Sequence, residues 1–125
     1  MKYVCLVYLD EATFEPWSDY ERGLMVNEAL DNDDVLRRSG NWVFANALEA
    51  PSAAISVRVR DGRMSTTDGP FAETKEHLSG FIVIEARDLN DAVRIAGNIP
   101  MARYGTMEVR PVRELQRMPV EGGGA

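Results

Sequence analysis

The chain has 125 residues, of which 45% are hydrophobic and 27% are charged. This composition is typical of one soluble globular domain. Its formal net charge of −6 comes without a basic stripe, which argues against direct binding of nucleic acid. No apolar run is long enough to cross a bilayer and the amino terminus lacks a signal-peptide pattern, so we expect a cytoplasmic protein with no membrane contact.

The first two predicted elements are a strand and a helix. Residues 3–9 form an apolar run rich in Val and aromatic residues, and its Cys5 is expected to be a small buried core residue. Ser18 and Glu21 have the spacing of a capping box, which predicts a helix start, and Gly40 suits the left-handed cap that ends a helix. The helix region is acidic, and its apolar residues fall on one broad side that Asp33 interrupts: Met25, Val26, Ala29, Leu30 and Leu36.

A strand and a hairpin are predicted next. Residues 41–48 alternate weakly and predict a strand with Trp42 and Phe44 on one face. Residues 55–60 alternate cleanly between apolar and polar side chains, and the Asp-Gly pair at 61–62 indicates a tight turn into a return strand.

The last third of the chain predicts a strand, a helix and a strand. Residues 80–86 are almost continuously apolar, which indicates a strand covered on both faces. Asp88 is expected to cap a second helix, which Pro100 prevents from continuing, and residues 107–112 are predicted to form the final strand. The apolar stripe expected on this second helix consists of Leu89, Ala92, Val93 and Ala96.

The order β-α-β-hairpin-β-α-β predicts an α+β, ferredoxin-like fold with the helices on one face of an antiparallel sheet. One domain is expected over residues 1–114, followed by a flexible tail at 115–125 that ends in a Gly-rich run. The other sheet face would expose alternate residues of the apolar run at 81–84, an apolar patch of the kind that marks an interface. We therefore expect a homodimer whose sheets pack face to face.

Chemistry-bearing residues concentrate in the segment from Asp68 to His77, defined here as the loop segment. Gly69 and Pro70 indicate a turn that presents side chains rather than hiding them. Because this irregular stretch holds carboxylates, an ammonium, a hydroxyl and the only imidazole of the chain, it is the predicted functional site.

The string Asp-Gly-Pro-Phe-Ala-Glu-Thr-Lys-Glu at 68–76 resembles the signature of the DGPF family, part of the YCII-related group. Residues 57–62, 80–81 and 108–112 agree with it, and the resemblance extends from residue 2 to residue 113. It implies α+β barrels formed by dimerisation, and genes that are often adjacent to those of extracytoplasmic-function sigma factors. The better-known branch of the group has a His in the first helix region and an Asp before a Pro-aromatic pair after the second helix. Neither is present here, so that acid–base dyad is not carried over.

Candidate site residues all come from the loop segment. Asp68, Glu73 and His77 are candidate catalytic acid–base groups. The candidate ligand-binding residues are Asp68, Phe71, Glu73, Lys75 and Glu76. Structural roles compete with these functions: the Asp68 carboxylate would accept backbone N–H groups in its turn, and Lys75 would pair with a surface carboxylate.

No metal or cofactor is expected. His77 has no companion His or Cys, and the chain lacks the glycine patterns that bind dinucleotides or phosphates. Three functions remain open: a domain that binds or senses a small polar molecule beside the loop segment, a small lyase or isomerase, and a regulatory partner associated with a sigma factor.

Overall fold

The computed structural model describes residues 1–120 and confirms the predicted order of elements. Its strands and helices are β1 (Lys2–Leu9), α1 (Asp19–Ser39), β2 (Trp42–Ala47), β3 (Ile55–Arg60), β4 (Arg63–Asp68), β5 (His77–Glu85), α2 (Leu89–Gly97) and β6 (Thr106–Pro111). Three short 3-10 turns join them: η1 (Glu11–Thr13), η2 (Pro51–Ala53) and η3 (Pro100–Arg103). Residues 121–125 of the predicted tail lie outside the described residues.

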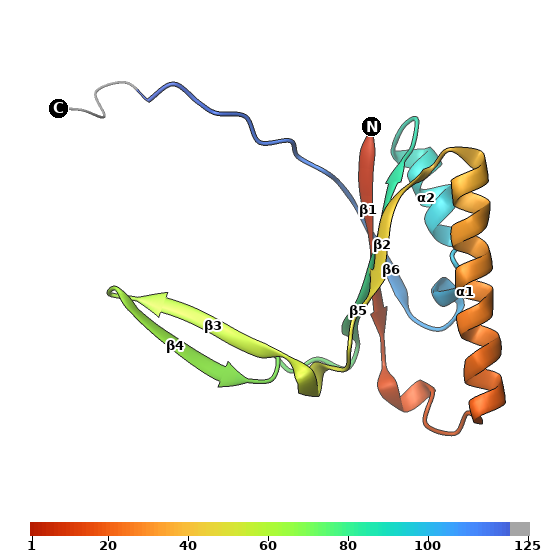
Figure 1. Cartoon of the computed structure of the whole chain (residues 1–125), viewed down its shortest axis with the longest axis horizontal. Helices are drawn as coiled ribbons and strands as arrows, with labels where there is room; N and C mark the ends of the chain where they lie inside the picture. Colours follow the sequence, from red (N-terminus) through yellow and green to blue (C-terminus); the bar gives the residue numbers. More distant parts are fainter. Residues whose placement is uncertain (121–125) are drawn as a thin grey trace.

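The body of the protein is a four-stranded antiparallel sheet in the order β2-β5-β1-β6, with both helices on one face (Figure 1). The helix-covered face holds the core, because alternate residues of a strand point to the same side. Buried side chains on β1 and β5 meet those of α2 and the end of α1: Tyr3, Cys5, Ile82, Ile84, Leu36, Ala92, Ile95 and Ala96. The predicted ferredoxin-like α+β fold is therefore confirmed.

Local signals set the ends of α1 as predicted. The Ser18 hydroxyl accepts a hydrogen bond from the backbone N–H of Glu21, whose carboxylate in turn accepts one from the backbone N–H of Ser18. Gly40 ends the helix with a φ of 79°. The predicted apolar side is less buried than expected, since Leu36 is the one buried residue of α1 and Val26 and Leu30 remain about half exposed.

Trp42 and Phe44 lie on opposite faces of the sheet, so the prediction that they share one face was wrong. Trp42 is aligned with Ile84 and packs against the core, whereas Phe44 is aligned with Val83 on the open face. A bulge between them inserts one extra residue into β2 and so reverses the alternation of side chains.

The buried face of α2 also differs from the predicted stripe. Asp88 caps the helix as expected, by accepting from the backbone N–H of Asp91. Asp91, Ala92, Ile95 and Ala96 are buried, whereas Leu89 and Val93 are about half exposed. The helix is thus turned so that an aspartate, rather than a leucine, faces the interior.

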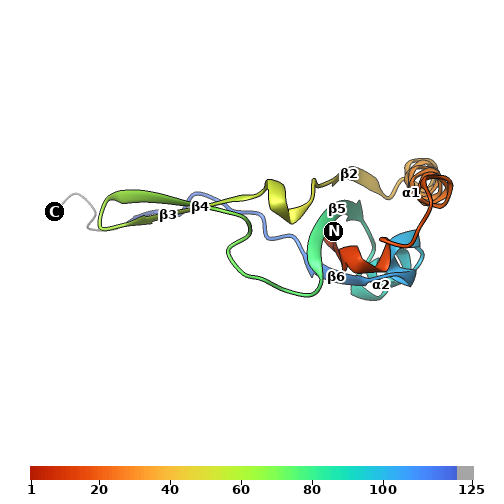
Figure 2. The ribbon, with the colours of Figure 1, turned by 90° about the horizontal axis from the view of Figure 1, so that it is seen from below.

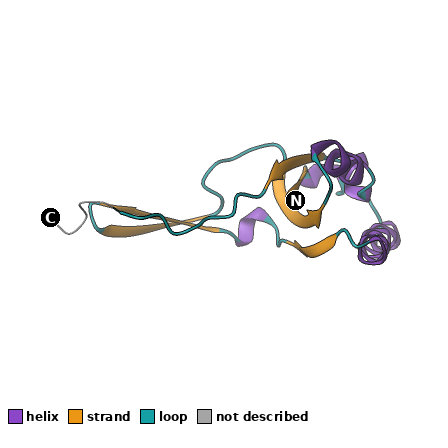
Figure 3. Cartoon of the chain, turned by 90° about the horizontal axis from the view of Figure 1, so that it is seen from above, coloured by secondary structure: helices purple, strands orange, loops and turns teal. Residues whose placement is uncertain are grey.

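The β3–β4 hairpin, residues 55–68, stands away from the body and is called the arm. It forms its own two-stranded sheet and projects on the side of the main sheet opposite the helices (Figures 2 and 3). Its tip is the predicted tight turn, in which Asp61 has a φ of 52° and Gly62 a φ of 73°.

Candidate ligand site at the base of the arm

The loop segment runs from the end of β4 at the arm base back to the first residue of β5. Its turn is held by backbone groups and a hydroxyl: the Gly69 N–H donates to the Ala54 carbonyl at 2.7 Å, and Ser56 Oγ donates to the Gly69 carbonyl at 2.8 Å. Gly69 has a φ of 92°, which suits glycine. Within residues 1–120 these hydrogen bonds hold the turn and none reaches the Asp68 carboxylate, so the predicted role of that carboxylate in fixing the turn was wrong.

The structure does not gather the candidate site residues into one cluster. Asp68, Phe71, Glu73 and Lys75 are exposed, and Phe71 retains 82% of its accessible surface. The predicted ion pair of Lys75 with a surface carboxylate is not among the salt bridges within residues 1–120. The side chains of the loop segment are thus left available for a ligand or for another surface.

Glu76 and His77 are half-buried, because the chain rejoins the sheet there. The Thr74 hydroxyl donates to the Glu76 carbonyl at 2.5 Å and shapes this return. His77 itself begins β5, where its backbone is aligned with Leu9 of β1. Of the six candidate residues, His77 is therefore the one that belongs to the four-stranded main sheet.

A pocket of about 340 Å³ lies at this junction, between the end of β2, η2 and the start of β5. Pro70 and His77, from the two ends of the loop segment, both line it. The other walls are mainly apolar and include Leu48, Pro51 and Leu78. Leu48 donates its N–H to the Ser79 carbonyl at 2.9 Å, which fixes the end of β2 against β5. The geometry thus forms a hollow with a largely apolar lining beside the predicted segment.

Glu49 also lines the pocket and was not predicted from the sequence. It is the second titratable group of the lining, in addition to His77. The two residues are far apart in the sequence and line the same pocket because β2 pairs with β5. The only local signal was the Ala50-Pro51-Ser52 break, which marks a chain reversal without indicating a pocket. Within the described part of the chain, neither Glu49 nor His77 forms an ion pair.

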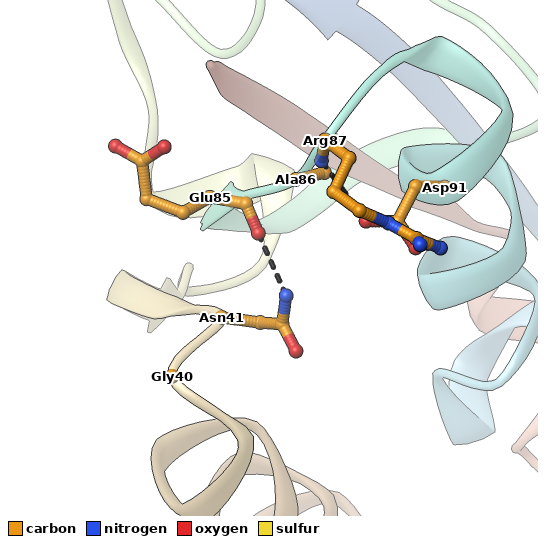
Figure 4. A pocket seen from close by; sticks show the side chains of 6 residues that line it. All are labelled: Gly40, Asn41, Glu85, Ala86, Arg87 and Asp91. Atoms are coloured by element: carbon orange, nitrogen blue, oxygen red, sulfur yellow. Dashed lines mark hydrogen bonds and ion pairs between the residues drawn. The ribbon is translucent and has the colours of Figure 1, made fainter.

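A second, smaller pocket of about 220 Å³ lies at the opposite end of β5, near Gly40, Asn41 and Asp91 (Figure 4). Its polar groups are already engaged. Asn41 Nδ2 donates to the Glu85 carbonyl at 2.8 Å, and the Asp91 carboxylate accepts from the Arg87 backbone N–H at 3.0 Å and from Arg94 Nη2 at 2.8 Å. These hydrogen bonds hold the pKa of Asp91 well below its usual range, despite burial of the side chain. These polar groups thus join the start of β2 to the end of β5 and fix the start of α2.

The remaining reactive group, Cys5, is buried in the core as predicted. Burial raises the pKa of its thiol to about 11, so the thiolate needed for nucleophilic chemistry is scarce at neutral pH. Within residues 1–120, no three His, Cys, Asp or Glu side chains lie close enough to hold a metal ion. In the same range, no helix has the length and apolar character needed to cross a membrane.

An antiparallel sheet in the order β2-β5-β1-β6 with two helices on one face defines a ferredoxin-like α+β protein. Within that class, the chain belongs to the YCII-related domain family, whose model matches residues 1–116. It is also similar to an uncharacterized protein of Rhizobium meliloti (strain 1021), with 32% identity over 114 residues that cover 90% of this chain and 92% of the relative.

Proposed function

We propose that this protein belongs to the DGPF branch of the YCII-related family and, as a homodimer, binds or senses a small molecule at the base of the arm. The observation that carries the proposal is that Pro70 and His77, from the two ends of the loop segment, line one pocket. Its volume of about 340 Å³ falls within the range typical of small-molecule sites.

The lining favours a ligand with an apolar body and one polar head group. Leu48, Pro51 and Leu78 supply apolar contact, and His77 and Glu49 supply hydrogen-bonding groups. Lys75 is exposed two residues before His77, and its flexible stem gives it the reach to neutralise an anionic head group. A small organic acid or a similarly polar metabolite fits this chemistry.

The open face of the sheet supports the homodimer. Aligned residues of three neighbouring strands, Val4, Phe44 and Val83, lie on that face with Leu6 and Phe81, and the rings of Phe44 and Phe81 are 5.9 Å apart. Phe44 is 52% exposed in the single chain. A second sheet packed on this face would remove these apolar side chains from water.

The test is a metabolite screen by native mass spectrometry, followed by affinity measurements on the ligand found. His77→Ala should weaken binding by roughly 10- to 150-fold, the equivalent of losing a hydrogen bond to a charged group, about 1.5–3 kcal/mol. Lys75→Ala should do so only if the ligand is anionic. Arg38→Ala, an exposed change on α1 that leaves the pocket lining intact, is the control. Unchanged affinity in His77→Ala would place the ligand elsewhere and contradict the proposal.

Acid–base catalysis is the second candidate, because Glu49 and His77 line the same pocket. A lyase or isomerase would turn over the bound molecule, and both Glu49→Gln and His77→Gln would then abolish turnover while binding persisted. A ligand recovered unchanged after prolonged incubation with the native protein favours binding alone.

A further inference from the structure

The arm has one apolar face and one basic face, both in water. Strand register places Val57 opposite Thr66 and Val59 opposite Met64 on the first face. Four large apolar residues on this face are 58–70% exposed: Ile55, Val57, Val59 and Met64. The opposite face presents three arginines toward the tip: Arg58, Arg60 and Arg63.

The exposed apolar side chains of the arm favour a second surface that packs against them. A two-stranded hairpin is marginally stable by itself, and contiguous exposed apolar side chains mark an interaction site. The described body of the same chain does not cover the arm, because β3 and β4 pair only with each other and point away from the helices (Figures 2 and 3). Within residues 1–120 nothing covers these apolar side chains, which favours a cover supplied by another molecule.

Length and direction favour a second copy of the chain. The arm leaves the body on its open-face side, where the proposed dimer would place the partner (Figure 1). Six residues of strand extend about 20 Å, packed sheets lie about 10 Å apart, and a helix layer adds about 10 Å. An arm of this length therefore reaches past the partner's sheet to the level of its helices.

Charge favours the first helix of that partner as the surface that the arm tip meets. The α1 helix holds six acidic residues against three arginines, and the wider stretch of residues 10–38 accounts for the whole net charge of −6. The same helix leaves Leu24, Val26, Leu30 and Val35 about half exposed. An acidic helix with unburied apolar residues complements a hairpin with an apolar face and a basic tip.

We propose that the two copies exchange arms: each arm packs its apolar face along the partner, and the long side chains of Arg60 and Arg63, which flank the turn at the tip, extend around the end of the arm to the acidic α1 of the partner subunit. This inference rests on the homodimer in the proposed function and adds a second contact to the sheet–sheet interface.

Sedimentation equilibrium of arm variants tests the exchange. Val57→Ser/Val59→Ser should weaken dimerisation tenfold or more, as should Arg60→Glu/Arg63→Glu. The effect of charge reversal should shrink as salt is raised from 0.1 M to 1 M, because the Debye length falls from about 10 Å to about 3 Å. The matched control is Ser65→Ala/Thr67→Ala on the other face of the arm, with folding of all variants checked by circular dichroism.

Cross-linking of mixed dimers supplies an independent readout. Met64→Cys in one copy and Leu30→Cys in a copy of different mass should be joined by a bismaleimide, and the native Cys5 is buried and will not compete. If the wild-type chain dimerises but both arm variants dimerise as tightly as wild type, the arm exchange is wrong and the sheet–sheet dimer stands. If the wild-type chain is monomeric, both proposals fail.

Discussion

At the scale of single residues, Asp91 shows how a charge is accommodated in the interior. Its side chain is 5% exposed, yet its carboxylate accepts hydrogen bonds from the Arg87 backbone and the Arg94 guanidinium. An aspartate at this depth is tolerated because its negative charge is compensated by fixed donors. It links the start of α2 to the strand end before it.

Asp91 should make stability depend on pH at the acid end. Its folded-state pKa is lowered, so its contribution is complete above the unfolded value of about 3.9 and is lost as the pH falls below that value. Asp91→Asn should lower the Tm at pH 7, and the difference from wild type should shrink on acidification towards pH 3. Thermal melts between pH 7 and pH 3 measure this difference in Tm. Asp88→Asn, which keeps a capping side chain, is the control. If the difference in Tm between Asp91→Asn and wild type is the same at pH 7 and pH 3, the stabilising role of the Asp91 carboxylate is wrong.

At the scale of elements, two glycines distinguish a close approach from an open position. Gly105 lies where the chain enters β6, and an added Cβ would collide with the Tyr8 carbonyl oxygen, which belongs to the backbone and is not free to move aside. Gly23 lies within α1, and apart from the backbone of its own helix and its chain neighbours no described atom lies within 4 Å of such a Cβ. The close approach of β6 to β1 therefore requires glycine at position 105. At position 23, by contrast, α1 has room for a side chain.

Alanine should have opposite effects at the two positions. Gly105→Ala should lower the free energy of unfolding by about 1–3 kcal/mol through overpacking. Gly23→Ala should raise it by about 0.5–1 kcal/mol, because alanine loses less entropy in a helix. Urea denaturation at one protein concentration compares them. If Gly105→Ala does not lower the free energy of unfolding, the β1–β6 junction adjusts more freely than the geometry indicates.

Local chemistry explains why the sequence predicted most elements and why it failed at particular residues. The Ser18–Glu21 capping box and the turn at 61–62 depend on neighbours in the chain, and both were predicted. The bulge in β2 follows from pairing with β5, and the rotation of α2 follows from the hydrogen bonds to Asp91, so neither appears in a periodic pattern.

The candidate site was predictable in part for the same reason. The unusual composition of the loop segment identified His77, which the structure places in the pocket. Glu49 needed knowledge of strand pairing, and the Asp68 carboxylate was assigned a role that the Ser56 hydroxyl and the Ala54 carbonyl fill instead. Spacing along the chain indicates where polar groups are concentrated, and tertiary pairing decides which of them share a pocket.

At the scale of the whole molecule, the open face of the sheet and the apolar face of the arm both lie on the side away from the helices (Figure 1). One partner seated on that side would cover both. Association with a sigma factor stays a prediction from the family resemblance. If the homodimer forms as proposed, a sigma factor would have to compete for the open face and the arm, or bind a different surface of the dimer.

The proposed homodimer is tested most directly by the mass of the native chain in solution, measured by sedimentation equilibrium at micromolar concentration. We expect twice the 13.9 kDa of the chain, and a shift towards the single-chain mass in Phe81→Ser, which places a polar group in the middle of the open face of the sheet. A wild-type mass of one chain at these concentrations would contradict it, because the apolar face and the arm would then both be exposed in the working protein.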